Sequence, residues 1–225
     1  MYLEINHLSK TIAHNTILQD ITLGMDRGRI YGLQGKNGSG KTMLMRAVCG
    51  LILPSEGEII IDGERLHKSI SFPRSVGALI ENPGFIAQYS GLKNLQILAS
   101  LKKKIETADI CCVMDELGLD PQDKKKYRKY SLGMKQKLGI AAAIMENPDL
   151  IVLDEPINAL DEKTVAIVKN ILLRHRERGA LILISCHDRE ELEYLSDEIF
   201  CLEEGRLTRS YLVGNSDSQR GEQEA

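Results

Sequence analysis

The chain has 225 residues, of which 43% are hydrophobic and 27% are charged, enough apolar material for one sizeable α/β domain or a domain with a large insertion. The formal net charge of −3 provides no overall basic field, so nucleic acid is not an expected partner. The lysine clusters at Lys102–Lys104 and Lys124–Lys126 are interpreted as solvated helix faces.

The cysteines and the lengths of the apolar runs indicate in which cellular compartment the chain is expected. Five cysteines without zinc-type spacing indicate isolated thiols in a reducing environment. No charged leader precedes an apolar run at the N-terminus, so we expect no signal peptide. Apolar runs such as Ala180–Ser185 are far shorter than the roughly 20 residues of a membrane helix. We therefore expect a cytoplasmic chain that reaches a membrane only through a partner.

The first third of the chain predicts mostly strands. The stretches "YLEINHLSK", "TILQDITLGM" and "RIYGLQG" within residues 1–35 are separated by polar and glycine breaks. A helix is expected over 41–49, ended by Gly50 and Pro54. The stretch "GEIIIDGERL" predicts a hairpin that turns at Asp62-Gly63.

The middle of the chain, from about residue 85 to 146, changes to a helical pattern. Its helices are expected in "GLKNLQILASLKKK", "ETADICCVMDELGL" and "LGMKQKLGIAAAIMEN". Buried strands then return in "DLIVLDEP" and "GALILISCHD", each followed by a helix-like stretch. This recurrence predicts a parallel α/β sheet into which a helical subdomain is inserted. From about Thr208 we expect a polar, loosely ordered tail.

A phosphate-binding loop is the strongest single motif. "GKNGSGKT" at 35–42 has a glycine, four residues and then Gly40-Lys41-Thr42, between an apolar strand and a helix. Glycines let backbone N–H groups converge on phosphate oxygens, and the helix N-terminus adds partial positive charge. Lys41 is expected to reach the β- and γ-phosphates, and Thr42 to offer its hydroxyl to Mg²⁺. The predicted phosphate contacts are Gly35, Lys36, Asn37, Gly38, Ser39, Gly40, Lys41 and Thr42.

Two later strands end in titratable residues. "LIVLDEP" ends in Asp154, a candidate for the Mg²⁺ shell, and Glu155, a candidate general base for an attacking water. "ALILISCH" ends in His187, which could contact the γ-phosphate and orient that water. Together with the phosphate loop, these residues favour nucleotide hydrolysis by Lys41, Glu155 and His187.

These motifs, in this order, resemble the nucleotide-binding subunit of an ABC transporter over about residues 2–207. The resemblance implies a P-loop NTPase (RecA-like) α/β core with an N-terminal antiparallel β-subdomain over 1–81 and 150–207, a helical subdomain over 82–149, and a tail over 208–225. It also implies ATP and Mg²⁺ held between two such subunits. The family signature, Leu-Ser-Gly-Gly-Gln, aligns with "YSLGM", which keeps Ser131 and Gly133 and departs at Leu132 and Met134. The stretch "ALD" matches the loop that, in the family, lines the dimer seam, here through Asp161.

Two departures from the family pattern are informative. Where the family has an aromatic ring on adenine, this chain has Ile12, which forfeits a stacking term of roughly 1 kcal/mol. Where most members have a glutamine, this chain has Glu81, a charged oxygen ligand for Mg²⁺. The stretch "GALIENPGF" with "YSLGMKQK" resembles the ATPase subunits of bacitracin and lantibiotic-type peptide exporters.

The resemblance implies an ATPase that dimerises with itself or a paralogue and drives separate membrane permease subunits at the inner face of the plasma membrane. "NPGFIAQYSGLKNL" would help to dock the permease through Phe85, Ile86 and Tyr89, or these side chains pack the helical subdomain's own core. Two alternative functions are a non-transport ABC ATPase and a regulatory module that holds nucleotide without turnover. The single phosphate loop counts against the first, and intact Lys41, Asp154, Glu155 and His187 count against the second.

Overall fold

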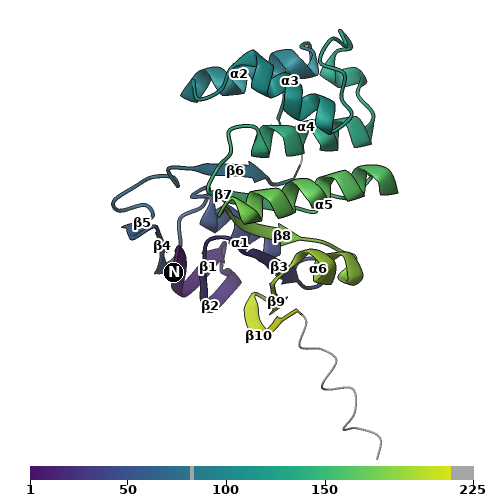
Figure 1. The fold of residues 1–225 in the computed structure, drawn as a ribbon. Helices are drawn as coiled ribbons and strands as arrows, with labels where there is room; N and C mark the ends of the chain where they lie inside the picture. The colour runs from purple at the N-terminus through teal and green to yellow at the C-terminus, as the bar shows by residue number, and fades with distance from the viewer. Residues whose placement is uncertain (82–83, 214–225) are drawn as a thin grey trace, which may run out of the picture.

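The computed structural model describes residues 1–81 and 84–213 (Figure 1). The strands are β1 (Leu3–Ile12), β2 (Asn15–Met25), β3 (Ile30–Gln34), β4 (Glu56–Ile61), β5 (Glu64–Arg65), β6 (Val76–Leu79), β7 (Leu150–Asp154), β8 (Leu181–Ser185), β9 (Glu198–Glu203) and β10 (Arg206–Leu212). The helices are α1 (Lys41–Val48), α2 (Gly91–Lys102), α3 (Thr107–Glu116), the short 3-10 helix η1 (Tyr127–Lys129), α4 (Leu132–Ile144), α5 (Glu162–Glu177) and α6 (Arg189–Leu195).

A six-stranded sheet forms the centre of the described chain, in the order β10-β9-β3-β8-β7-β6. Strands β9, β3, β8, β7 and β6 are parallel, and β10 runs antiparallel to β9. The strand that enters the phosphate loop, β3, therefore lies between β8 and β9, with β7 one strand further. Because the strands are parallel, the loops after β3, β7 and β8 leave the sheet at the same edge.

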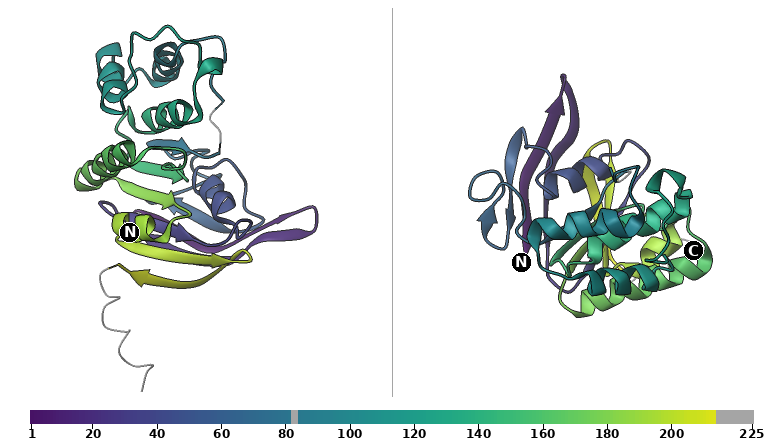
Figure 2. Two further views of the ribbon diagram at one scale, coloured as in Figure 1. Left: turned by 90° about the vertical axis from the view of Figure 1, so that its right-hand side faces the viewer. Right: turned by 90° about the horizontal axis from the view of Figure 1, so that it is seen from above.

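The N-terminal strands form a second, antiparallel sheet in the order β2-β1-β4-β5. The predicted hairpin is present: β4 pairs with β5, and the turn residues Asp62 and Gly63 have φ of 52° and 77°. Both values are left-handed, as a two-residue turn matching the twist of a hairpin requires. The β1–β2 hairpin extends away from the rest of the molecule (Figure 2).

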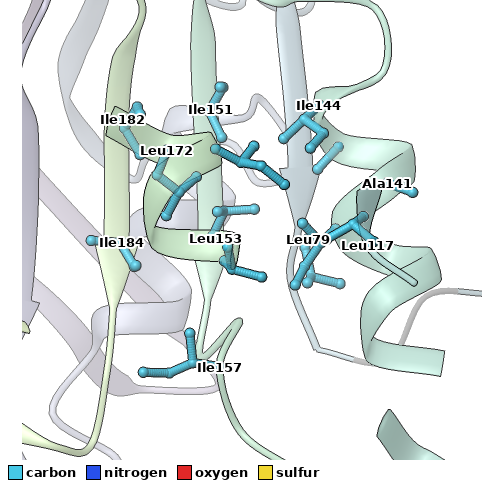
Figure 3. Packing of buried hydrophobic residues seen from close by; sticks show 14 of the residues in the cluster. Leu79, Leu117, Ala141, Ile144, Ile151, Leu153, Ile157, Leu172, Ile182 and Ile184 are labelled. Atoms are coloured by element: carbon cyan, nitrogen blue, oxygen red, sulfur yellow. The ribbon is translucent and has the colours of Figure 1, made fainter. Parts of the chain in front are cut away.

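The parallel strands are apolar on both faces because each face packs against a different layer. In β7, Leu150 and Val152 face a core shared with α1 and the antiparallel sheet, whereas Ile151 and Leu153 face a core shared with the helices. Figure 3 shows Leu172 of α5 against β7 and β8. Strands buried on both faces read as continuous apolar runs, which explains the sequence pattern of "LIVLD" and "LILIS".

The helical subdomain lies above the sheet in Figure 1 and is joined to it through α4. A Cβ atom at Gly77 of β6 would overlap the carbonyl oxygen of Ala143 in α4, so glycine permits this close packing. Ser90 caps α2 by accepting a hydrogen bond from Lys93 N at 3.3 Å, and Ser131 caps α4 in the same way. The inserted helical subdomain predicted from the sequence is confirmed.

Some details differ from the sequence-based expectation. Residues Thr208–Leu212 are not a loose tail, because β10 continues through Leu212 and pairs with β9, with Tyr211 opposite Ile199. The rest of the predicted tail, residues 214–225, lies outside the described residues. The lysines at 124–126 are exposed but belong to the loop before η1 rather than to a helix face.

All five cysteines are free thiols. Within residues 1–81 and 84–213, no helix has the length and apolarity needed to cross a membrane.

Candidate functional site

The phosphate loop joins β3 to α1 in a tightly folded arch. Lys41 is buried, and its Nζ donates to the carbonyl oxygens of Gly35 at 2.7 Å and Lys36 at 3.1 Å. A Cβ atom at Gly35 would lie 2.4 Å from the backbone carbonyl oxygen of Leu202, so a larger residue would not fit there. Gly38 has a φ of 81° at the exposed crest of the loop, a conformation that favours glycine. The loop thus brings the lysine, backbone N–H groups and a helix N-terminus together, as the sequence predicts.

The carboxylate at the end of β7 is held between two hydroxyl groups. Thr42 Oγ1 donates to Asp154 Oδ2 at 2.6 Å, and Ser185 Oγ donates to Asp154 Oδ1 at 2.5 Å. Ser185 ends β8 and is completely buried. A hydroxyl and a carboxylate at this spacing are hard oxygen donors of the kind that Mg²⁺ prefers. The two residues predicted to share a metal are therefore adjacent in the folded chain.

The next residue, Glu155, is held at both of its carboxylate oxygens. His187 Nε2 lies 2.6 Å from Oε1, and Asn158 Nδ2 donates to Oε2 at 2.6 Å. Since a carboxylate only accepts hydrogen bonds, His187 Nε2 carries the proton in this contact. The backbone N–H of Glu155 donates to Ser185 Oγ at 3.1 Å. Glu155 has a φ of 51°, an uncommon conformation for a residue with a side chain, and such strain concentrates at functional sites.

The fit of this site to a nucleotide with Mg²⁺ rests on its donors. The loop supplies Lys41 and a buried Ser39 hydroxyl that has no hydrogen-bond partner among the described residues. A cavity of about 1020 Å³ opens beside the loop, lined by residues 35–39, His187 and the β9–β10 hairpin. Together with Thr42 and Asp154, these groups suit a phosphate chain and its hard metal ion.

The predicted signature segment begins α4. Ser131 is exposed, and its Oγ accepts a hydrogen bond from Met134 N at 3.2 Å, so it caps the helix. Leu132 is 63% exposed beside it. The Met134 side chain packs against the core that the helices share with one face of the sheet, which explains how an apolar residue is accommodated where the family pattern has glutamine. A Cβ atom at Gly133 would lie 3.0 Å from the carbonyl oxygen of Ala159, so this helix end lies against the segment after β7.

Glu81 has a different partner from the one that the sequence suggested. Its carboxylate forms an ion pair with Arg46 of α1, with 2.7 Å between Arg46 Nη2 and Glu81 Oε2. Glu81 has a φ of 57° and is exposed. In this conformation the ion pair, rather than a metal-type pair with Thr42 or Asp154, accounts for the Glu81 side chain.

Two other predicted contacts come from the start of the chain and from the segment before α5. Ile12 is 46% exposed and pairs with Asn15 at the end of the β1–β2 hairpin. Asp161 caps α5 and accepts hydrogen bonds from Thr164 N at 2.9 Å and Thr164 Oγ1 at 3.0 Å. These bonds from Thr164 lower the pKa of Asp161.

The predicted docking segment separates into two kinds of residue. Phe85 packs edge-on against Tyr127 with 5.1 Å between ring centroids and belongs to the helical subdomain's own core. Ile86 and Tyr89 are 45% and 42% exposed. Asn82 and Pro83, at the start of this stretch, lie outside the described residues.

Four residues that support the site were not singled out from the sequence. They are Ser185 and Asn158, which hold the two carboxylates, Arg46, which pairs with Glu81, and Gln136. Gln136 Nε2 donates to the carbonyl oxygens of Glu155 at 2.9 Å and Pro156 at 3.0 Å. Only Ser185 had a usable signal, because it ends a strand that lies beside the strand of Asp154.

Known proteins with similar sequences and folds include ATP-binding subunits of transporters. A family model described as ABC transporter matches residues 18–158. The chain is 49% identical to the uncharacterized ABC transporter ATP-binding protein YybJ of Bacillus subtilis (strain 168), over 94% of this chain and 97% of that one. It is 39% identical to the bacitracin transport ATP-binding protein BcrA of Enterococcus faecalis, over 91% and 67%.

It is also 33% identical to the lantibiotic transport ATP-binding protein SrtF of Streptococcus pyogenes, over 91% of this chain and 88% of that one. Among solved structures, the structure of an ATP binding subunit of an ABC transporter matches with a TM-score of 0.88 and 27% identity, covering 100% of this chain and 95% of the other. The chain therefore belongs to the ABC transporter family, as an ATP-binding subunit.

Proposed function

We propose that this chain binds Mg·ATP between two ATP-binding subunits, hydrolyses it with Glu155 as base, and thereby drives separate membrane subunits that export a peptide antibiotic. The observation that carries the hydrolytic part is the arrangement of Asp154 and Glu155 side by side at the edge of the sheet, each held by its own partners. Thr42 and Ser185 bind Asp154, and His187 contacts Glu155.

The metal site is proposed on the first of these carboxylates. Thr42 and Asp154 would hold Mg²⁺, which supplies charge neutralisation for the phosphates when bound. Ser185 keeps one Asp154 oxygen fixed, so the carboxylate faces the Thr42 hydroxyl in a defined orientation. Glu81 joins this shell only if its ion pair with Arg46 opens.

The catalytic base is proposed on the second carboxylate. Glu155 takes a proton from the attacking water, and His187 stabilises the orientation of its carboxylate through the 2.6 Å contact. Each Glu155 oxygen has one contact among the described residues, with His187 or with Asn158, and a second lone pair that can accept the proton. Lys41 turns from its two carbonyl partners toward the β- and γ-phosphates.

The dimer is proposed from the exposed start of α4. Ser131 and Leu132 leave the N-terminus of α4 accessible, and a helix N-terminus attracts phosphate. A second subunit placing this end on the nucleotide of the first would complete the site, with Asp161 near the seam. The second subunit is another copy or a paralogue, and Ile86 and Tyr89 contribute to docking of the permease at the inner face of the plasma membrane.

The cargo is proposed from the relatives, one of which is named for bacitracin transport and another for lantibiotic transport. The test is to express the chain with its membrane subunits in a sensitive host and to measure growth inhibition by bacitracin and by a lantibiotic. We expect the wild-type chain to raise the inhibitory concentration of one of them, and Lys41→Ala to abolish the effect. Equal susceptibility with both chains, despite phosphate release by the wild type, would exclude this cargo class.

A further inference from the structure

The segment that follows β7 is held in an unfavourable backbone conformation. Glu155 and Ala159, at its two ends, have φ of 51° and 62°, although neither is glycine. A residue in this region costs on the order of 1–3 kcal/mol and persists only where the surroundings determine it. The backbone contacts of residues 155–159 therefore decide where the Glu155 carboxylate points.

One of these contacts comes from α4. The side-chain amide of Gln136 has two N–H groups, and Nε2 lies 2.9 Å from the carbonyl oxygen of Glu155 and 3.0 Å from that of Pro156. Both successive carbonyls are thereby turned toward α4. The close approach of Gly133 to the Ala159 carbonyl oxygen brings the same helix against the far end of the segment.

We propose that Gln136 is a positioning residue for Glu155 and connects the signature end of α4 to the base of the same chain. Ser131, the cap of α4, lies five positions before Gln136. A displacement of the helix start by a nucleotide on the partner therefore moves the two carbonyls that orient Glu155. This inference rests on the proposed role of Glu155.

The test uses the full-length chain purified in complex with its membrane subunits. Gln136→Met keeps the length of the side chain and removes both donors. Because a misplacement of roughly 1 Å costs about 10²-fold, we expect kcat to fall by between roughly 10- and 10²-fold. The KM for ATP and the Kd for a fluorescent ATP analogue should remain those of the wild type.

The matched control is Gln96→Met. Gln96 Nε2 donates to Thr107 Oγ1 at 3.2 Å between α2 and α3, so this variant loses a donor in the same subdomain away from the 155–159 segment. Its kcat should equal that of the wild type. If Gln136→Met does not fold, Gln136→Asn keeps the amide but cannot reach both carbonyls, and it carries the same expectation.

A double variant separates this inference from the proposed function. If Gln136 acts through Glu155, then Gln136→Met adds no further loss to Glu155→Gln, because the two effects are not independent. Multiplied losses in the double variant would overturn the inference, as would a normal kcat in Gln136→Met or a joint loss of kcat, nucleotide binding and melting temperature. Normal turnover in Glu155→Gln alone would instead overturn the role of Glu155.

Discussion

Ser185→Ala tests whether a single buried hydroxyl holds both the Asp154 carboxylate and the Glu155 backbone. Ser185 Oγ donates to Asp154 Oδ1 at 2.5 Å and accepts from Glu155 N at 3.1 Å, and the residue is completely buried. Alanine leaves both groups with one fewer partner. Asp154 keeps Thr42, and Glu155 N keeps the Ser185 carbonyl oxygen at 3.2 Å, so neither group is left entirely unpaired.

A hydrogen bond to a charged group contributes about 1.5–3 kcal/mol, and Ser185 Oγ donates one to the Asp154 carboxylate, so we expect a loss of about 2 kcal/mol in the free energy of unfolding. For a chain of this size, that loss lowers the melting temperature by about 4–8 °C. The matched control is Ser196→Ala, because Ser196 Oγ is buried with no hydrogen-bond partner among the described residues. Its removal leaves nothing unpaired, so the melting temperature should stay the same or rise slightly.

The assay is thermal unfolding followed by circular dichroism, with Mg²⁺-dependent nucleotide binding measured on the same preparations. Ser185→Ala should also weaken the Mg²⁺ dependence of ATP binding, since Asp154 is no longer fixed from the side of β8. Equal melting temperatures for Ser185→Ala and Ser196→Ala would refute the reasoning. A destabilised Ser185→Ala that keeps wild-type Mg²⁺ affinity would confine Ser185 to a structural role.

Three other expectations follow from the site and its surroundings. Glu81→Gln loses the exposed ion pair with Arg46, which contributes about 0–1 kcal/mol to stability. The variant should also weaken the preference of ATP hydrolysis for Mg²⁺ over other divalent cations. Unchanged metal preference and turnover would remove Glu81 from the metal shell. With aliphatic Ile12 at the base position, GTP should support turnover near that with ATP, and Ile12→Tyr should lower the KM for ATP by about fivefold. Burial lowers the pKa of His175 to about 4, so the folded state loses stability as pH falls from 6.5 toward 4. The loss in the free energy of unfolding is on the order of 1–2 kcal/mol after solvent screening. His175→Gln should remove this pH dependence, as measured by thermal unfolding at several pH values.

The direction of the His175 effect follows from proton binding. Below its ordinary pKa of 6.5 an unfolded histidine binds a proton that the folded, neutral His175 does not. The unfolded state is therefore favoured by acid within this window, and the stability is complete above it. The neighbouring charges of Arg178 and Arg174 act in the same direction as burial.

The architecture was largely accessible from the sequence because its signals are local. The apolar runs "LIVLD" and "LILIS", the loop glycines and the Asp62-Gly63 turn each correspond to the element expected from them. The end of the sheet was not accessible, since Arg206–Leu212 is too polar to be recognised as a strand. Its pattern reflects a strand at the edge of the sheet that pairs with β9 on one side.

In the candidate site, too, the residues in short motifs were predicted from the sequence, and contacts between separate elements were not. Lys41, Thr42, Asp154 and His187 belong to short motifs, and the chain brings them together as expected. Gln136, which contacts the Glu155 carbonyl oxygen, comes from another element, 19 residues from Glu155 in the chain. This contact depends on how α4 packs against the segment after β7, and no spacing in a single sequence reveals it.

The sequence shows that Glu81 is an unusual residue but does not show which residue it contacts. The departure from glutamine is visible in "ALIEN", yet its ion pair depends on Arg46, a residue of α1 without a motif of its own. Phe85 was grouped with Ile86 and Tyr89 by sequence, and only its packing on Tyr127 separates it from them.

The most direct test of the central claim is phosphate release by Glu155→Gln in the complex with the membrane subunits, with bound nucleotide measured in the same sample. We propose Glu155 as the base from its contacts with His187 and Asn158, so the variant should retain ATP and release phosphate at least about 10²-fold more slowly than the wild type. Phosphate release near the wild-type rate would contradict the account.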